Sequence, residues 1–237
     1  MPTPTYGNPL NIGRTVSHYE NGGVPGIHIE DQVFPKKCGH VQGKHVMPAE
    51  EKTQKILAAV DARLSKDFII IARTDSRAVD GLDSAISRAK IYKKAGADVL
   101  FIEAPESREE IEKVAKSLKG NPLLLNWLEG KRTPPLSYEE LDRLGSKILL
   151  FPLGGLLTTY IVILEHLLTT KNEDMPKNAL NRMTSFSEFL DFIGLQEIKK
   201  LENRYGVSKR SSRNANSLSY RRVLGVMPTS SRPRALR

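Results

Sequence analysis

Residues 68–75 read FIIIARTD, so five apolar residues are followed at once by an arginine, a threonine and an aspartate. The apolar part does not alternate with polar residues, which predicts a strand covered on both faces. Four further runs have the same character, at residues 26–29, 99–102, 123–125 and 148–151. Because helical patterns lie between these runs, the order of elements predicts an α/β fold built on a parallel sheet.

Between the runs, apolar residues recur at the 3.6-residue spacing of amphipathic helices. One stripe lies within residues 53–64, a second within 82–89 and a third within 111–118. A further helix is predicted to begin at Ser137, because Glu140 stands three residues later and completes a capping box. This alternation fits either an α/β barrel or an open doubly wound sheet.

Beyond residue 151 the sequence predicts helices only. One covers residues 156–170, and a second runs from the capping box of Ser185 and Glu188 to Gly206. Residues 207–237 contain eight basic side chains and no acidic one, so the net charge of +9 falls to +1 for the rest of the chain. We therefore predict one domain over residues 1–206 and a basic, disordered tail over residues 207–237.

Cys38 is the only cysteine, which excludes an intramolecular disulfide and fits a reducing compartment, with the cytoplasm as the simplest location. No apolar run approaches the roughly 20 residues of a membrane span, and no secretory signal opens the chain. The basic tail offers only salt-sensitive, non-specific attraction to nucleic acid. Neither a membrane nor a specific nucleic acid is expected as a partner.

Polar residues appear where the predicted strands should end. Glu30, Arg73, Glu103 and Asn126 each stand directly after an apolar run. In parallel α/β folds such residues converge on one pocket at the carboxyl ends of the strands. Arginine can pair with a carboxylate through two hydrogen bonds, and carboxylates suit Mg²⁺. The set predicts a pocket for an anionic, metal-chelating ligand, and its recurrence at four strand ends disfavours the alternative of simple surface caps.

The long connection after the first strand contains Lys36-Lys37-Cys38-Gly39-His40. Loops longer than about 12 residues in compact domains are often functional lids. Lysine and histidine neighbours stabilise a thiolate, which suits Cys38 to act as a general acid or base. Two alternatives stay open: an incidental thiol on a charged loop, and a cysteine nucleophile served by His40, which a separation of two residues does not establish.

Four stretches together resemble one known family. Residues 26–32, 36–40, 72–75 and 101–104 read GIHIEDQ, KKCGH, ARTD and FIEA. The pattern is similar to that of the isocitrate lyase and phosphoenolpyruvate mutase superfamily. Within it, the chain most resembles the 2-methylisocitrate lyase-like enzymes, which are related to carboxyvinyl-carboxyphosphonate phosphorylmutase. The resemblance implies a (β/α)₈ TIM-type barrel, a C-terminal helix exchanged between the subunits of a dimer or tetramer, and a bound Mg²⁺ or Mn²⁺.

The resemblance also implies a reaction and a role for each residue. Enzymes of this group cleave the C2–C3 bond of a 2-hydroxy acid and release an α-keto acid such as pyruvate. By position, Cys38 would protonate the departing carbanion, assisted by Lys36 and His40. Arg73 would bind a substrate carboxylate and stabilise the enolate. The remaining site residues would be Gly39, Glu103 and Asn126 around the substrate, and Glu30, which would reach the metal through water.

The sequence departs from this family at its front. Relatives carry an Asp-x-Asp-Thr-Gly stretch whose acids organise the metal, whereas residues 2–7 here read PTPTYG. Only five of the eight strands of a barrel are apparent, so we expect an N-terminally shortened, incomplete barrel with two open sheet edges. Its activity is expected to depend on a further segment.

Two alternatives to a lyase follow from the same features. A non-catalytic partner of a complete paralogue would use the open sheet edges. A phosphonomutase or an oxaloacetate-decarboxylase-like enzyme would share the barrel, but the resemblance disfavours both because such members generally lack the Cys38-centred loop.

Overall fold

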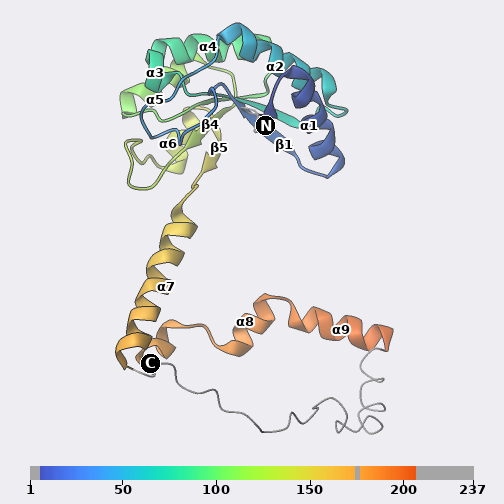
Figure 1. The fold of residues 1–237 in the computed structure, drawn as a ribbon, viewed down its shortest axis with the longest axis vertical. Helices are drawn as coiled ribbons and strands as arrows, with labels where there is room; N and C mark the ends of the chain where they lie inside the picture. Colours follow the sequence, from blue (N-terminus) through green and yellow to red (C-terminus); the bar gives the residue numbers. More distant parts are fainter. Residues whose placement is uncertain (1–5, 174–176, 207–237) are drawn as a thin grey trace, which may run out of the picture. The chain divides into compact units, whose positions relative to one another are not determined.

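The computed structural model describes residues 6–173 and 177–206 (Figure 1). The chain divides into two compact units, with the boundary between Ile161 and Val162. The first unit holds a parallel sheet whose strands follow one another in sequence order. The strands are β1 (Gly26–Glu30), β2 (Ile69–Thr74), β3 (Val99–Ile102), β4 (Leu123–Asn126) and β5 (Ser146–Leu150). The α/β class and the five predicted strands are confirmed.

Six helices of the described chain precede or connect these strands. They are α1 (Pro9–Asn21), α2 (Ala49–Ala62), α3 (Arg77–Asp80), α4 (Leu82–Lys94), α5 (Arg108–Ser117) and α6 (Tyr138–Arg143). The capping box predicted at Ser137 is present at the start of α6. Helix α1 was not predicted from the sequence, although Asn8 caps it by accepting a hydrogen bond from the Asn11 backbone nitrogen at 3.0 Å.

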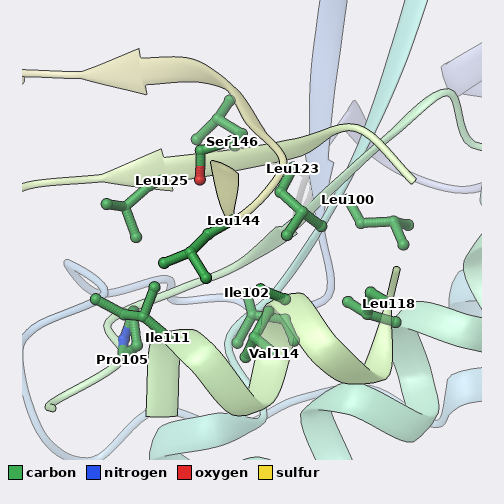
Figure 2. A pocket seen from close by; sticks show the side chains of 12 residues that line it. Leu100, Ile102, Pro105, Ile111, Val114, Leu118, Leu123, Leu125, Leu144 and Ser146 are labelled. Carbon is green, nitrogen blue, oxygen red and sulfur yellow. The ribbon is translucent and has the colours of Figure 1, made fainter. Parts of the chain in front are cut away.

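One face of the sheet packs against helices. Ile27, Ile29 and Ile70 contact α1 and α2 residues, and the next strands continue the same face with Ala72, Leu100, Ile102 and Leu123 against α2, α4 and α5. Between α5 and strands β3 and β4 lies an apolar cavity of about 20 Å³ (Figure 2). A space of that size holds about one water molecule at most, so we interpret it as a packing gap rather than a ligand site.

The opposite face of the sheet carries a cluster made of strand residues alone. Val99, Phe101 and Leu124 are buried there, while Ile69, Ile71, Ile148 and Leu150 are only partly buried. This is the arrangement of a TIM-type barrel wall, in which helices cover the outside and the other face turns inward. Strands β1 and β5 form the two ends of the sheet order.

Helix α7 (Gly154–Glu173) crosses the boundary between the units, and the rest of the second unit is helical where it is described. Its elements are the 3₁₀ helix η2 (Lys177–Arg182), α8 (Phe186–Phe192) and α9 (Leu195–Tyr205). The single helix predicted from Ser185 to Gly206 is wrong, because Gly194 adopts φ of +86° and separates α8 from α9. The capping box of Ser185 and Glu188 is confirmed.

The predicted basic tail, residues 207–237, lies outside the described residues. Within the part of the chain that the structure describes, no helix combines the length and apolar character needed to cross a membrane.

Candidate active site

The four polar residues predicted at strand ends come together at the carboxyl edge of the sheet. Glu30 and Asn126 are the last residues of β1 and β4, Arg73 is next to last in β2, and Glu103 directly follows β3. The strand register places Glu30 beside Arg73. Because the carboxyl ends of parallel strands lie at one edge of the sheet, these four side chains converge there.

Arg73 occupies the centre of this group. Its Nε donates to Asp75 Oδ2 at 2.8 Å, and its Nη2 donates to Asp75 Oδ1 at 3.1 Å. Two further carboxylates approach it, with Nε 3.5 Å from Glu30 Oε2 and Nη1 3.5 Å from Glu103 Oε2. The guanidinium carbon also lies 5.1 Å from the centre of the Phe101 ring. The arginine is therefore held from several sides in a buried, charged setting.

Glu103 links the sheet to the loop after β1. Asn126 Nδ2 donates to Glu103 Oε1 at 3.2 Å, and His40 Nε2 lies 3.5 Å from the same oxygen. The backbone of Gly39 lies so close to the Glu103 carboxylate that a Cβ at this position would overlap it. A glycine is thus required at residue 39 if the loop is to approach the sheet this closely.

The loop carrying the predicted acid/base is anchored beside the site. The Gln32 side chain accepts a hydrogen bond from the Lys37 backbone nitrogen and donates one to the Lys37 carbonyl oxygen, both at 2.9 Å. Lys36 Nζ lies 2.7 Å from Glu30 Oε1. Cys38 is exposed, and its thiol takes part in none of the hydrogen bonds found among the described residues. The structure brings Lys36, Gly39 and His40 to the group but leaves the Cys38 thiol facing solvent.

Burial and neighbouring charges shift the pKa values of three residues of the site. Burial raises the pKa of Glu103, although the Arg73 charge partly offsets this. Burial lowers the pKa of His40, and the positive charges of Lys44 and Arg73 lower it further. For Arg73, burial works to lower the pKa, but the bonds and charges of its carboxylate partners outweigh burial and raise it. The site therefore combines an arginine whose pKa is raised with a histidine whose pKa is lowered.

Unsatisfied polar atoms mark where a ligand would bind. Among the described residues, eight buried side-chain atoms lack a hydrogen-bond partner, and seven of them belong to strand ends or to the loops that follow them. They come from Glu30 (both carboxylate oxygens), His40, Glu103, Asn126, Glu129 and Thr133. The 2.7 Å contact of Lys36 with Glu30 is an ion pair without the geometry of a hydrogen bond. Buried polar atoms are normally satisfied, so this concentration indicates a place for oxygen-rich ligands or water.

A cavity of about 380 Å³ opens beside the loop. Its lining includes Gly39, His40 and Lys44 from the loop, together with Arg77, Ala104 and Arg132. Ala104 adopts a φ of 55°, a left-handed conformation that is strained for a residue other than glycine. Strain of this kind clusters at functional sites, and the cavity has the size of a small-molecule pocket.

The donor set fits a metal ion only in part. The described residues hold no group of three or more His, Cys, Asp or Glu side chains that could bind a metal. Glu30 nevertheless presents two buried oxygens without hydrogen bonds. Mg²⁺ often keeps several water ligands and takes one or two carboxylates together with ligand oxygens. Within the described ranges, the chain thus supplies an acidic contact from Glu30 and not a complete metal centre.

Three residues of the site region were present in the sequence patterns without a predicted role. Asp75 fixes Arg73, as described above, and Lys44 is buried against Asp75 with Nζ 3.7 Å from Oδ1. Asp31 faces the helix side, where Thr74 Oγ1 and Tyr92 Oη donate to it at 2.6 and 3.0 Å. A charged residue directly after a buried strand was the available signal for both aspartates, but spacing alone does not show which face each one takes.

The chain matches a family model described as phosphoenolpyruvate phosphomutase over residues 4–158. It is 42% identical over 204 residues to 2,3-dimethylmalate lyase of Eubacterium barkeri, covering 86% of this chain and 70% of that protein. It is 41% identical over 199 residues to 2-methylisocitrate lyase of Aeropyrum pernix, covering 82% of this chain and 62% of that protein. The chain therefore spans about two thirds of the length of these relatives.

Solved structures agree with this similarity. A crystal structure of 2,3-dimethylmalate lyase, described as a member of the PEP mutase/isocitrate lyase superfamily, superposes with a TM-score of 0.79 at 35% identity, covering 86% of this chain and 67% of that one. A phosphonopyruvate hydrolase in complex with oxalate and Mg²⁺ superposes with a TM-score of 0.74 at 27% identity, covering 86% and 70%. The resemblance found in the sequence is confirmed.

Proposed function

The chain belongs to the phosphoenolpyruvate mutase and isocitrate lyase superfamily, and on that premise we propose that it is a carbon–carbon lyase of the 2-methylisocitrate lyase type. Its substrate would be a 2-hydroxy di- or tricarboxylate, cleaved to an α-keto acid such as pyruvate and a second carboxylate. The observation that carries the proposal is the position of Arg73 among Glu30, Glu103 and Asp75, beside the loop of residues 36–40.

In the proposed reaction, water takes the proton of the C2 hydroxyl, and the oxygen electrons form the C=O bond of the α-keto acid. The C2–C3 bond breaks, and its electron pair passes to C3 of the departing carboxylate fragment. Arg73 binds a carboxylate and stabilises negative charge on the enolate, for which a fixed guanidinium in a buried site is well suited. Cys38 gives its proton to the departing carbanion once the loop presents the thiol to the pocket. Lys36 and His40 adjust the charge around that thiol.

The other predicted site residues would hold the substrate. Gly39 lets the loop lie against Glu103, and Asn126 donates to Glu103 while keeping its own Oδ1 unsatisfied. Burial raises the pKa of Glu103, and its Oε2 atom has no hydrogen-bond partner, so this side chain is available to contact a substrate oxygen or a bridging water.

We further propose Mg²⁺ or Mn²⁺ as the cofactor, with Glu30 reaching it through water. Support comes from the two unsatisfied oxygens of Glu30 and from the Mg²⁺–oxalate complex of the structurally similar phosphonopyruvate hydrolase. When bound, the cation supplies positive charge for the oxygens of the keto acid. Titration with oxalate, with and without Mg²⁺, tests this independently of turnover: Mg²⁺ should raise the oxalate affinity of the chain but not of the Glu30→Gln variant.

The lyase proposal is tested by measuring pyruvate release. The purified chain is given Mg²⁺ and either 2-methylisocitrate or 2,3-dimethylmalate, and pyruvate is expected from at least one of them. The same assay is repeated with an added N-terminal segment from a relative, because the chain spans about two thirds of the relatives' length. No pyruvate in any of these mixtures would rule the proposal out.

A homo-oligomer is proposed as the working assembly. The helices from α7 onward expose large apolar side chains, including Leu156 at 65%, Tyr160 at 65%, Phe186 at 76% and Phe192 at 86% of their surface. Exposed apolar surface of this extent favours association, and the family resemblance implies that a second copy covers it. Light scattering should give the mass of a dimer or tetramer, while a monomer at micromolar concentration would contradict the proposal.

A non-catalytic assembly role is the second candidate, favoured by the strand-only face of the sheet and by its end strands β1 and β5. A complete paralogue could pair its strands with either end. Copurification with such a paralogue, together with function that survives Cys38→Ser, would support this role over the lyase. The cytoplasm remains our predicted location, on the basis of the single cysteine.

A further inference from the structure

Lys44 is a buried lysine at the far end of the loop that carries Cys38. Its side chain is 2% exposed, although the residue lies in a connection between secondary-structure elements. The ammonium donates to the carbonyl oxygen of Gly39 and lies 3.7 Å from Asp75 Oδ1, whose side chain is fully buried. A lysine is rarely buried unless it is paired, so this position is specified by its two partners.

The two partners of Lys44 belong to different parts of the site. Gly39 follows Cys38 directly and lies against the Glu103 carboxylate. Asp75 accepts two hydrogen bonds from Arg73. One side chain therefore connects the loop of the proposed acid/base to the arginine that would bind the substrate.

Other contacts also hold the loop, and two of them reach carboxylates that neighbour Arg73: Lys36 Nζ lies 2.7 Å from Glu30 Oε1, and His40 Nε2 lies 3.5 Å from Glu103 Oε1. The Gln32 side chain hydrogen-bonds both the backbone nitrogen and the carbonyl oxygen of Lys37, and the Val41 backbone nitrogen donates to the Cys38 carbonyl oxygen at 2.9 Å. These contacts set the local shape of the loop before and after Cys38. The contact of Lys44 differs because its buried ammonium donates to a backbone carbonyl in the middle of the loop while lying beside the Asp75 carboxylate.

We propose that Lys44 is a positioning residue that holds the segment Cys38-Gly39 against the Arg73–Glu103 group by joining the Gly39 carbonyl to the Asp75 carboxylate. The role rests on the proposed lyase function, since it presupposes that Cys38 and Arg73 act on one substrate. Without the ammonium, the Gly39 carbonyl loses its donor and Asp75 loses a neighbouring charge, so the loop opens more often.

The alternative is that Lys44 only stabilises the fold as a whole. The two roles predict different regions of unfolding when Lys44 is replaced. Loss of a positioning contact opens residues 36–41 and leaves helices such as α2 and α5 protected, whereas loss of global stability exposes all segments together.

The test uses the full chain, its Lys44→Met and Lys44→Arg variants, and Lys90→Met as a control for removing an exposed lysine of α4. Limited trypsin digestion is followed by mass spectrometry at Lys36 and Lys37 in the loop and at Lys55 and Lys116 in helices. Alkylation of Cys38 by iodoacetamide is measured in parallel, with and without Mg²⁺ and oxalate, because it is the only thiol in the chain.

For Lys44→Met we expect cleavage after Lys36 and Lys37 to accelerate by about tenfold or more, with unchanged cleavage at Lys55 and Lys116. Any protection of Cys38 by Mg²⁺ and oxalate should be lost in the same variant. In Lys44→Arg, which keeps a charged donor, the cleavage rate after Lys36 and Lys37 should stay within about threefold of the rate in the parent chain. In Lys90→Met, the cleavage rate should equal that of the parent chain.

Two results would overturn the proposal: loop cleavage in Lys44→Met at the parent rate, or equal acceleration at the loop and helix sites. The digestion needs no turnover. A chain that releases no pyruvate but shows loop-specific cleavage in Lys44→Met would therefore reject the lyase function and keep the positioning role of Lys44.

Discussion

Arg73 and Asp75, two residues apart at the end of β2, form a two-point pair with nitrogen–oxygen distances of 2.8 and 3.1 Å. Both side chains are buried, at 11% and 0% exposure. Two hydrogen bonds fix the plane of a guanidinium as well as its position. Asp75 therefore occupies Nε and Nη2 of Arg73 and leaves Nη1, which lies 3.5 Å from Glu103 Oε2, as the nitrogen available to a ligand.

Replacing Arg73 by lysine should separate charge from geometry. Lys keeps the positive charge but cannot form the two-point pair with Asp75 while also reaching a substrate carboxylate. We expect kcat/KM for pyruvate release to fall by about 100-fold or more, with the variant still folded. Lys90→Met is the matched control. An Arg73→Lys variant whose kcat/KM is within threefold of the parent value would show that the two-point guanidinium pair is not needed.

Gly39→Ala should damage the site without loosening the core. The added Cβ would overlap the Glu103 carboxylate, so either the loop or Glu103 must shift. We expect a loss of oxalate affinity of about tenfold or more and little change in the melting temperature, because the loop contributes few residues to the buried core. Gly120→Ala is a useful comparison for steric effects, since no atom lies near its Cβ position, although its φ of +83° adds backbone strain.

Lys52 makes stability depend on pH. It is completely buried in α2, its Nζ has no hydrogen-bond partner, and burial lowers its pKa from 10.5 to about 7, partly offset by the charge of Asp31. Between about pH 7 and pH 10.5 the unfolded chain holds a proton on this lysine that the folded chain does not. The free energy of unfolding therefore rises with pH across that window, and the full destabilisation caused by burying Lys52 is present below pH 7.

Lys52→Met should accordingly stabilise the chain most at acidic and neutral pH. Each unit of lowered pKa corresponds to about 1.4 kcal/mol, and we expect a gain of roughly 2–4 kcal/mol at pH 6 because local relaxation reduces the full cost. The gain should shrink as the pH rises toward 10. Urea unfolding at several pH values measures it, with Lys90→Met as the control; a difference between variant and parent that does not change with pH would refute the account.

The sequence was sufficient for the strands and for the residues at their ends. Apolar runs without alternation located all five strands, and the rule that parallel strands end at one edge brought Glu30, Arg73, Glu103 and Asn126 together correctly. Capping boxes gave the starts of α6 and α8 because both halves of the motif lie within four residues.

Features that depend on tertiary contacts or on single backbone angles were missed. Helix α1 has only Ile12 and Val16 as buried residues, which is a weak periodic signal. The break at Gly194 depends on one left-handed angle that a helical pattern can hide. Lys44 and Asp75 belong to separate segments of the chain, so no spacing rule could assign this pair.

The central claim is that Cys38 protonates a carbanion formed by cleavage of a carbon–carbon bond, and NMR analysis of the products formed from 2-methylisocitrate in D₂O tests it most directly. The account predicts equal amounts of pyruvate and of succinate carrying one new C–D bond, and loss of both products in Cys38→Ser despite an unchanged fold. Equal product formation by Cys38→Ser, or succinate without deuterium from the parent chain, would contradict it.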